Sequence, residues 1–176
     1  MFLGFVELLR VVIRMSDDEL KELTPEEIEA LRAMFFKEIS AGPAEELRLI
    51  VHPELEQLLY NNVDIMAALL VDSSGFPIDF VTKYETKLKQ EDLLVIASAN
   101  IWGLFAASER ESMGLNLGHV KRIITRTKNG FLFITRCGEN FVLAAIIRPR
   151  ARLGVIMREL AVAAKKIAEK TSNYTL

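Results

Sequence analysis

The stretch from Glu91 to Met113 constrains the fold of this chain more than any other. It contains no proline, a single glycine and many strong helix formers, which predicts a helix of about six turns. At about 100° per residue its apolar residues fall on two roughly opposite sides: Leu93, Ile96, Ala97 and Leu104 on one, and Val95, Ala99, Trp102 and Ala106 on the other. A helix that is apolar on both sides must be covered from two directions.

One of these two sides can pack on the sheet of the same domain. The other side needs either the N-terminal helices of the same chain or a second chain. We favour the second chain, and we expect the dimer or partner interface at Val95, Ala99, Trp102 and Ala106.

The composition describes a globular protein with a well-filled core. The chain has 176 residues, of which 51% are apolar, so it can hold one ordinary domain and an extension. A formal charge of −2 gives no reason to expect nucleic acid as the main partner. Cys137 is the single cysteine, which excludes an intramolecular disulfide and fits a cytoplasmic location.

The N-terminal third predicts helices. Ser16 with Glu19, and Thr24 followed by Pro25, have the spacing of helix starts. We expect Gly42-Pro43 to end the second of these helices, and two short helices, 44–50 and 54–60, to follow with a break at His52-Pro53. Residues 1–62 are therefore expected to form a helical extension.

The first fifteen residues of this extension, Met1–Met15, are apolar but interrupted by charges. No apolar run in the chain is long enough to span a bilayer. As a helix, Met1–Met15 could lie on a membrane surface or dock into a groove. The sequence also leaves open whether the native chain starts at Met1 or Met15.

From Asp64 onward the pattern changes to strands. The apolar runs 65–71 and 141–147 read as interior strands, and Pro77 marks 76–80 as an edge strand. Strands 120–127 and 131–137 follow the long helix and meet at the hairpin signal Asn129-Gly130. Placing the two apolar strands side by side gives a five-stranded antiparallel sheet of order 2-1-5-4-3.

An amphipathic stripe from Leu153 to Ile167 predicts a closing helix. The expected fold class is therefore α+β, with one long helix, a C-terminal helix and a helical N-terminal extension. The domain should span residues 63–171, and 172–176 should form a short tail.

The sequence offers little catalytic chemistry. His52 and His119 lie in different regions without an Asp, Ser or Cys at motif spacing, and Cys137 has no histidine neighbour. The glycine patterns of phosphate-binding loops and the spacings of metal sites are both missing. We therefore expect no catalytic residue, metal or cofactor, and a protein that is not an enzyme.

One charged segment stands out. Arg148, Arg150 and Arg152 lie between the last strand and the last helix. They could contact an acidic partner, deliver an arginine into a partner's phosphate site or form an ordinary solvated surface. Of these roles we expect contact with an acidic partner.

Several segments together resemble the roadblock/dynein light chain family. They are AALLVDSSGFPI, AASERESMGLNLG, VKRIITRTKNGFLFI, GENFVLAAII and ARLGVIMRELAVAA, which cover about Asp64 to Lys170. The resemblance implies a two-layer α+β fold that dimerises through the long helix and a neighbouring strand edge. The helical N-terminal region departs from the minimal family module.

The resemblance also implies a function. Members of the family typically bind small Ras-like GTPases as dimers, and prokaryotic members are usually read as GTPase regulators. We expect a dimeric, non-enzymatic regulator or scaffold for such a GTPase, with GTPase activation as one form of that role. The alternatives are a ligand-sensing module and a membrane-tethering adaptor that uses Met1–Met15.

Overall fold

The computed structural model describes residues 43–84 and 91–174. By its internal contacts the chain divides into two compact units, Met1–Glu46 and Leu47–Leu176, and the second is described here by itself. The expected helix starts at Ser16 and Thr24, and the segment Met1–Met15, lie outside the described residues. The division at residues 62 and 171 stays a proposal.

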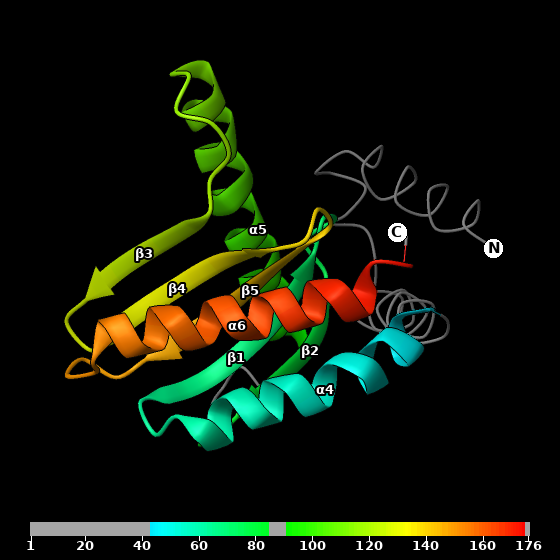
Figure 1. The fold of residues 1–176 in the computed structure, drawn as a ribbon, viewed down its shortest axis with the longest axis vertical. Helices are drawn as coiled ribbons and strands as arrows, with labels where there is room; N and C mark the ends of the chain where they lie inside the picture. The colour runs from blue at the N-terminus through cyan, green and yellow to red at the C-terminus, as the bar shows by residue number, and fades with distance from the viewer. Residues whose placement is uncertain (1–42, 85–90, 175–176) are drawn as a thin grey trace, which may run out of the picture. The chain divides into compact units, whose positions relative to one another are not determined.

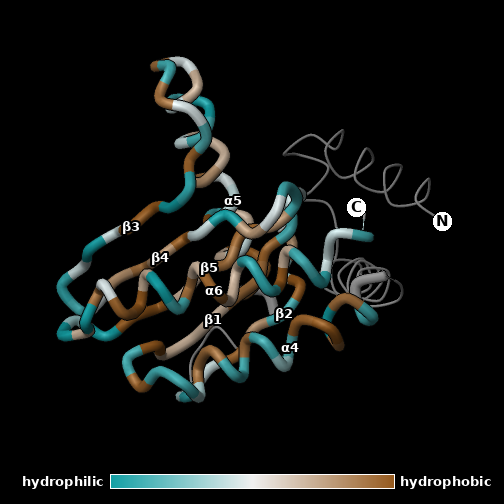
Figure 2. The backbone as a smooth tube through the Cα atoms, viewed as in Figure 1, coloured by the Kyte–Doolittle hydropathy of each residue, from teal (hydrophilic) through white to brown (hydrophobic). Residues whose placement is uncertain are grey.

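The predicted sheet is confirmed. Within the described residues, five antiparallel strands have the order β2-β1-β5-β4-β3. The strands are β1 (Ile65–Asp72), β2 (Pro77–Thr82), β3 (Arg122–Thr127), β4 (Gly130–Cys137) and β5 (Phe141–Ile147). The apolar strands β1 and β5 are central and almost fully buried, and Figure 2 colours them mostly on the hydrophobic side.

Two helices cover one face of the sheet. They are α4 (Pro43–Asn61) and α6 (Leu153–Thr171), which lie in front of the sheet in Figure 1. Alternate side chains of the strands point toward them. The core on this side, which we call the double-covered face, includes Leu70, Phe133 and Leu143 from the sheet, Leu55 from α4 and Leu160 from α6.

The structure corrects the expected break at His52-Pro53. Helix α4 is continuous from Pro43 to Asn61, with Pro53 inside it. A proline at this position removes one helical hydrogen bond. Packing overrides this local preference, because Val51 and Leu55 on either side of the proline are buried in the core.

On the opposite face lies one of the described helices. Helix α5 (Glu91–Gly114) has the predicted position and length, and its C-terminal half extends beyond the sheet in Figure 1. The core here includes Leu69, Val71, Ile134 and Val142 from the strands, together with Phe105 from α5. We call this the single-covered face.

Candidate functional site

The side of α5 that packs on the sheet is a narrow stripe. Leu94, Ser98, Ile101 and Phe105 recur at helical spacing, and each is buried or packs against the core of the single-covered face. The buried Ser98 hydroxyl donates a hydrogen bond to the Leu94 carbonyl oxygen at 2.7 Å, so it leaves no unpaired polar group. Trp102 also packs partly against this core, whereas Ile96 and Leu104 are exposed elsewhere on the helix.

An apolar cleft lies beside this stripe. It has a volume of about 280 Å³ and opens between α5 and the strands. Its walls include Ala67, Ala144, Leu132 and Ile146 from the sheet and Ala97 and Ile101 from α5. The small alanine side chains leave this space unfilled, and the cleft is apolar except for Asn100 at its margin.

Helix α5 therefore has two flanks on either side of its sheet-facing stripe. On the cleft flank lie Ala97 and Leu104, and Leu104 remains 43% exposed. Ile96, on the outer surface, is 57% exposed. The structure corrects the expectation that one of the two predicted apolar sides packs on the sheet, because Ile96 and Leu104 are exposed and the sheet-facing stripe lies between the two groups.

The other flank carries the residues predicted to form an interface. Val95, Trp102 and Ala106 are half-buried there, and Ala99 is exposed. This flank faces the β1–β2 turn, where a β-carbon on Gly75 would lie 3.2 Å from the Ala99 Cα and 3.7 Å from the Trp102 Cβ. Trp102 also stacks on Phe105, with 6.0 Å between ring centroids, so it contributes to the core of its own chain.

An ionic cluster holds the C-terminal half of α5 in place. One oxygen of Glu109, Oε1, lies 2.5 Å from His119 Nδ1 and accepts a hydrogen bond from Arg136 at 2.7 Å. The other, Oε2, accepts the backbone N–H of Val120 at 2.7 Å. The Arg136 guanidinium also lies 5.0 Å from the centre of the Phe105 ring. We call Glu109, His119 and Arg136 the α5 brace.

The brace changes the acidity of its carboxylate. The hydrogen bond from His119 is the main cause that lowers the pKa of Glu109 to about 2, and the contacts with Val120 and Arg136 act in the same direction. Glu109 is therefore ionised at neutral pH. The cluster has no signal in the sequence, because Glu109, His119 and Arg136 have no motif spacing and come together only in the folded domain.

The strand next to the brace is a free edge among the described strands. β3 pairs with β4 on one side and has no strand partner on the other. Four of its six residues are exposed, including Ile124 with 45% of its surface accessible. Such an edge can accept a further strand, because its outer N–H and C=O groups have no partner in the sheet.

Comparison with known proteins agrees with this geometry. The model of the Roadblock/LC7 domain matches residues 53–147, more than half of the chain. The chain belongs to the Roadblock/LC7 family. Comparison with curated proteins finds no match.

Solved structures share the fold of this Roadblock/LC7 domain. The gliding protein MglB from Thermus thermophilus superposes with a TM-score of 0.62 at 19% identity, over 76% of this chain and 94% of that one. An MglB with a tetrameric arrangement gives 0.62 at 20% identity, over 74% and 92%. Myxococcus xanthus MglB gives 0.63 at 16% identity, over 70% and 96%. At these identities the likeness establishes the fold.

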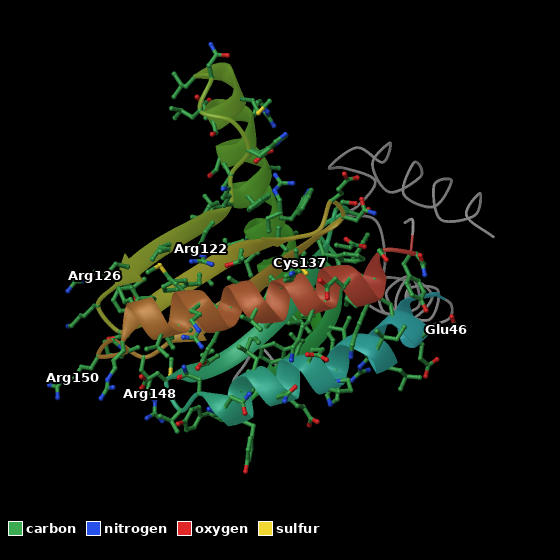
Figure 3. All side chains as sticks on the ribbon, in the orientation of Figure 1. Glu46, Arg122, Arg126, Cys137, Arg148 and Arg150 are labelled. Carbon is green, nitrogen blue, oxygen red and sulfur yellow. The ribbon has the colours of Figure 1, made fainter. Side chains whose placement is uncertain are left out.

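The three arginines predicted to contact a partner lie at one end of this Roadblock/LC7 domain. Arg148, Arg150 and Arg152 are exposed in the β5–α6 loop. Arg148 donates a hydrogen bond to the Tyr84 hydroxyl, and its guanidinium lies 5.6 Å from the centre of that ring. Figure 3 shows Arg148 and Arg150 together at this end, well away from the tip of α5.

His52 and Cys137, the remaining residues considered for catalysis, make contacts that stabilise the fold. Asp79, whose side chain is 1% exposed, is bound from α4 by Arg48 at 3.2 Å and by His52 at 2.8 Å. The Cys137 thiol donates a hydrogen bond to the Ala164 carbonyl oxygen, and burial raises its pKa to about 12, which disfavours a reactive thiolate. Among the described residues no group of three potential ligands is placed to hold a metal ion.

The described part of the chain has no helix with the properties of a membrane span. None of its helices combines the length and the hydropathy that crossing a bilayer requires.

Proposed function

We propose that this protein is a dimeric, non-enzymatic regulator or scaffold that binds a small Ras-like GTPase in the cytoplasm. The single-covered face supports the dimer most directly. One helix lies over a five-stranded sheet and leaves an apolar cleft beside it. Contiguous apolar surface of this kind marks an interaction site.

A second copy of the chain suits this surface. Its α5 would supply the row of apolar side chains that the cleft requires, while the alanines Ala67 and Ala144 permit close approach. The exposed edge of β3 is a second surface for the dimer. It can pair with β3 of the partner and so extend the sheet. The tetrameric arrangement named for one MglB structure concerns an assembly of that relative.

The proposal leaves two candidate flanks of α5 for the dimer contact. Sequence analysis suggests Val95, Ala99, Trp102 and Ala106, which lie toward the β1–β2 turn. We favour the cleft flank with Leu104, since its apolar neighbours form a concave surface. Both sets belong to the same helix, so substitutions can separate them.

The mass of the chain in solution tests the dimer. Light scattering should give twice the subunit mass of 19.9 kDa. Leu104→Glu should shift the mass to that of a monomer and preserve the circular dichroism spectrum, because it places an unpaired charge in the interface. Ala106→Glu is the matched variant on the other flank. A monomer from Ala106→Glu alone would assign the contact to the sequence-predicted flank, and a monomeric wild type would refute the dimer.

The GTPase role rests on the family resemblance and needs its own test. A Ras-like GTPase from the same source should bind the wild-type dimer with an affinity that depends on whether it carries GDP or a GTP analogue. A hydrolysis assay then distinguishes a regulator from a scaffold. Failure of the GTPase to bind in both nucleotide states would refute this part of the proposal.

The cleft also supports a second candidate function, ligand sensing. Its volume of about 280 Å³ is close to the lower limit of small-molecule sites, about 300 Å³. A bound apolar ligand would raise the melting temperature of the Leu104→Glu monomer, whereas a cleft used only for dimerisation would give no such shift. The third role, membrane tethering through Met1–Met15, concerns residues outside the described part of the chain.

A further inference from the structure

Cations from three segments converge at one end of the sheet. Lys83 follows β2, Arg126 and Lys128 belong to the end of β3 and the β3–β4 turn, and Arg148, Arg150 and Arg152 form the β5–α6 loop. We call these six residues the basic end. Figure 3 shows Arg126, Arg148 and Arg150 on this side of the molecule.

Backbone pairing explains why these segments meet. Phe131 of β4 pairs with Ile147 of β5, and a β-carbon on Gly130 would lie 2.3 Å from the Ile147 carbonyl oxygen. The β3–β4 turn is thus packed against the start of the β5–α6 loop. Burial and the nearby Arg148 lower the pKa of Lys83, and the Asp64 carboxylate acts in the opposite direction, so Arg148 and Asp64 both lie close to Lys83.

One carboxylate, that of Asp64, lies close enough to the basic end to raise the pKa of Lys83. Within the described residues, none of the six cations of the basic end forms an ion pair with a carboxylate. Of the eight basic residues in the segment 119–152, five belong to the basic end, and the single acidic residue of that segment, Glu139, lies in the β4–β5 turn at the other end of the sheet. A protein with a net charge of −2 therefore presents a strongly positive surface at this end.

Exposed apolar side chains lie among these cations. Val63 is 71% exposed and precedes Asp64, whose carbonyl oxygen accepts the Arg148 N–H. Tyr84 is 45% exposed and contacts the Arg148 guanidinium. Val155 is 47% exposed, and its backbone N–H donates a hydrogen bond to the Arg152 carbonyl oxygen. The basic end thus combines positive charge with side chains that can enter an apolar layer.

We propose that the basic end binds the surface of an anionic lipid membrane. Clusters of four to eight cations are attracted to acidic headgroups, and stable membrane contact takes a second, apolar signal in addition to charge. Arg150 and Arg152 lie in a loop and have no side-chain partner in the described chain, so they can follow a fluid layer of headgroups. Binding there leaves α5 and its cleft free, and the proposal therefore goes beyond the regulator role and is independent of it.

Vesicle sedimentation with the full-length protein tests this proposal. Wild type should sediment with vesicles of phosphatidylcholine and phosphatidylglycerol and not with phosphatidylcholine alone, and added salt should weaken binding. Arg150→Gln/Arg152→Gln should reduce partitioning about thirtyfold, from about 1 kcal/mol for each cation. Lys165→Gln/Lys166→Gln on α6 is the matched control and should retain binding.

The other results overturn the proposal. Equal binding of wild type to both kinds of vesicle would exclude an anionic surface. Wild-type binding by Arg150→Gln/Arg152→Gln would place the membrane contact elsewhere, for example in Met1–Met15. If this variant sediments normally but loses the GTPase, the partner of the basic end is an acidic protein. Solution mass and GTPase binding of the same variants keep this test separate from that of the regulator role.

Discussion

The two faces of the sheet differ in how completely they are covered. The double-covered face packs against α4 and α6, and its core includes twenty buried residues among those that the structure describes. Of the described helices only α5 covers the single-covered face, and the core there has six buried residues in the described part of the chain. Since the same five strands supply both faces, the difference comes from the number of helices. The first face stabilises the fold, and the second has exposed apolar side chains that we propose for dimerisation.

Polar contacts follow the same division. On the double-covered face, Asp79 connects β2 to α4, and Arg122 donates to the Met157 carbonyl oxygen of α6 at 3.1 Å. On the single-covered face the α5 brace supports a helix end that extends beyond the sheet (Figure 1). Polar groups thus anchor packed helices on one side and orient a projecting helix on the other.

The largest expected effect is a loss of stability that differs between the two faces of the sheet. Leu160→Ala on α6 should lower the free energy of unfolding by about 3 kcal/mol, because it opens a cavity at a fully buried site. Leu104→Ala on α5 is the matched variant and should change the stability of the protomer by less than about 0.5 kcal/mol. Urea denaturation at one low protein concentration measures both. Equal losses would contradict the division into a packed and an open face.

A smaller effect is expected where α4 is anchored. Asp79→Asn removes the charge that Arg48 and His52 bind, and should cost about 1 kcal/mol, since both partners are partly exposed to solvent. Hydrogen exchange should become faster in α4 and stay unchanged in α5. Unchanged exchange in α4 would show that apolar packing alone holds this helix.

The smallest effect concerns the orientation of α5 and its dependence on pH. Because the pKa of Glu109 is lowered to about 2 from its ordinary value of 4.5, the brace stabilises the folded state above pH 4.5 and loses this contribution as the pH falls toward 2. Glu109→Gln should speed hydrogen exchange in the C-terminal half of α5 at neutral pH. The difference from wild type should vanish near pH 2, and a constant difference would refute the ionic brace.

Much of the fold was predictable because its signals are local. The apolar runs of β1 and β5, Pro77 at an edge and the hairpin at Asn129-Gly130 are enough to order the strands. The prediction of a helical break at Pro53 was wrong, because burial of the neighbouring Val51 and Leu55 outweighs the loss of one hydrogen bond. Local preference predicts an element well only where tertiary packing agrees with it.

The candidate site was predictable as a helix but not as a surface. Periodicity identified α5 as apolar on more than one side, yet it could not show which side meets the sheet. Trp102 looked like an interface residue and also packs on Phe105 of its own chain. The cleft depends on small side chains from separate strands, such as Ala67 and Ala144, which have no joint signal in the sequence.

The sequence by itself therefore determined the fold class, the strand order and the excess of apolar surface on α5. These follow from periodicity and turn chemistry, which act over a few residues. Only the tertiary structure decided which flank of α5 borders the cleft, that Glu109 meets His119 and Arg136, and that distant cations share one end. Such contacts join residues far apart in the chain, and they exist only once the sheet has brought them together.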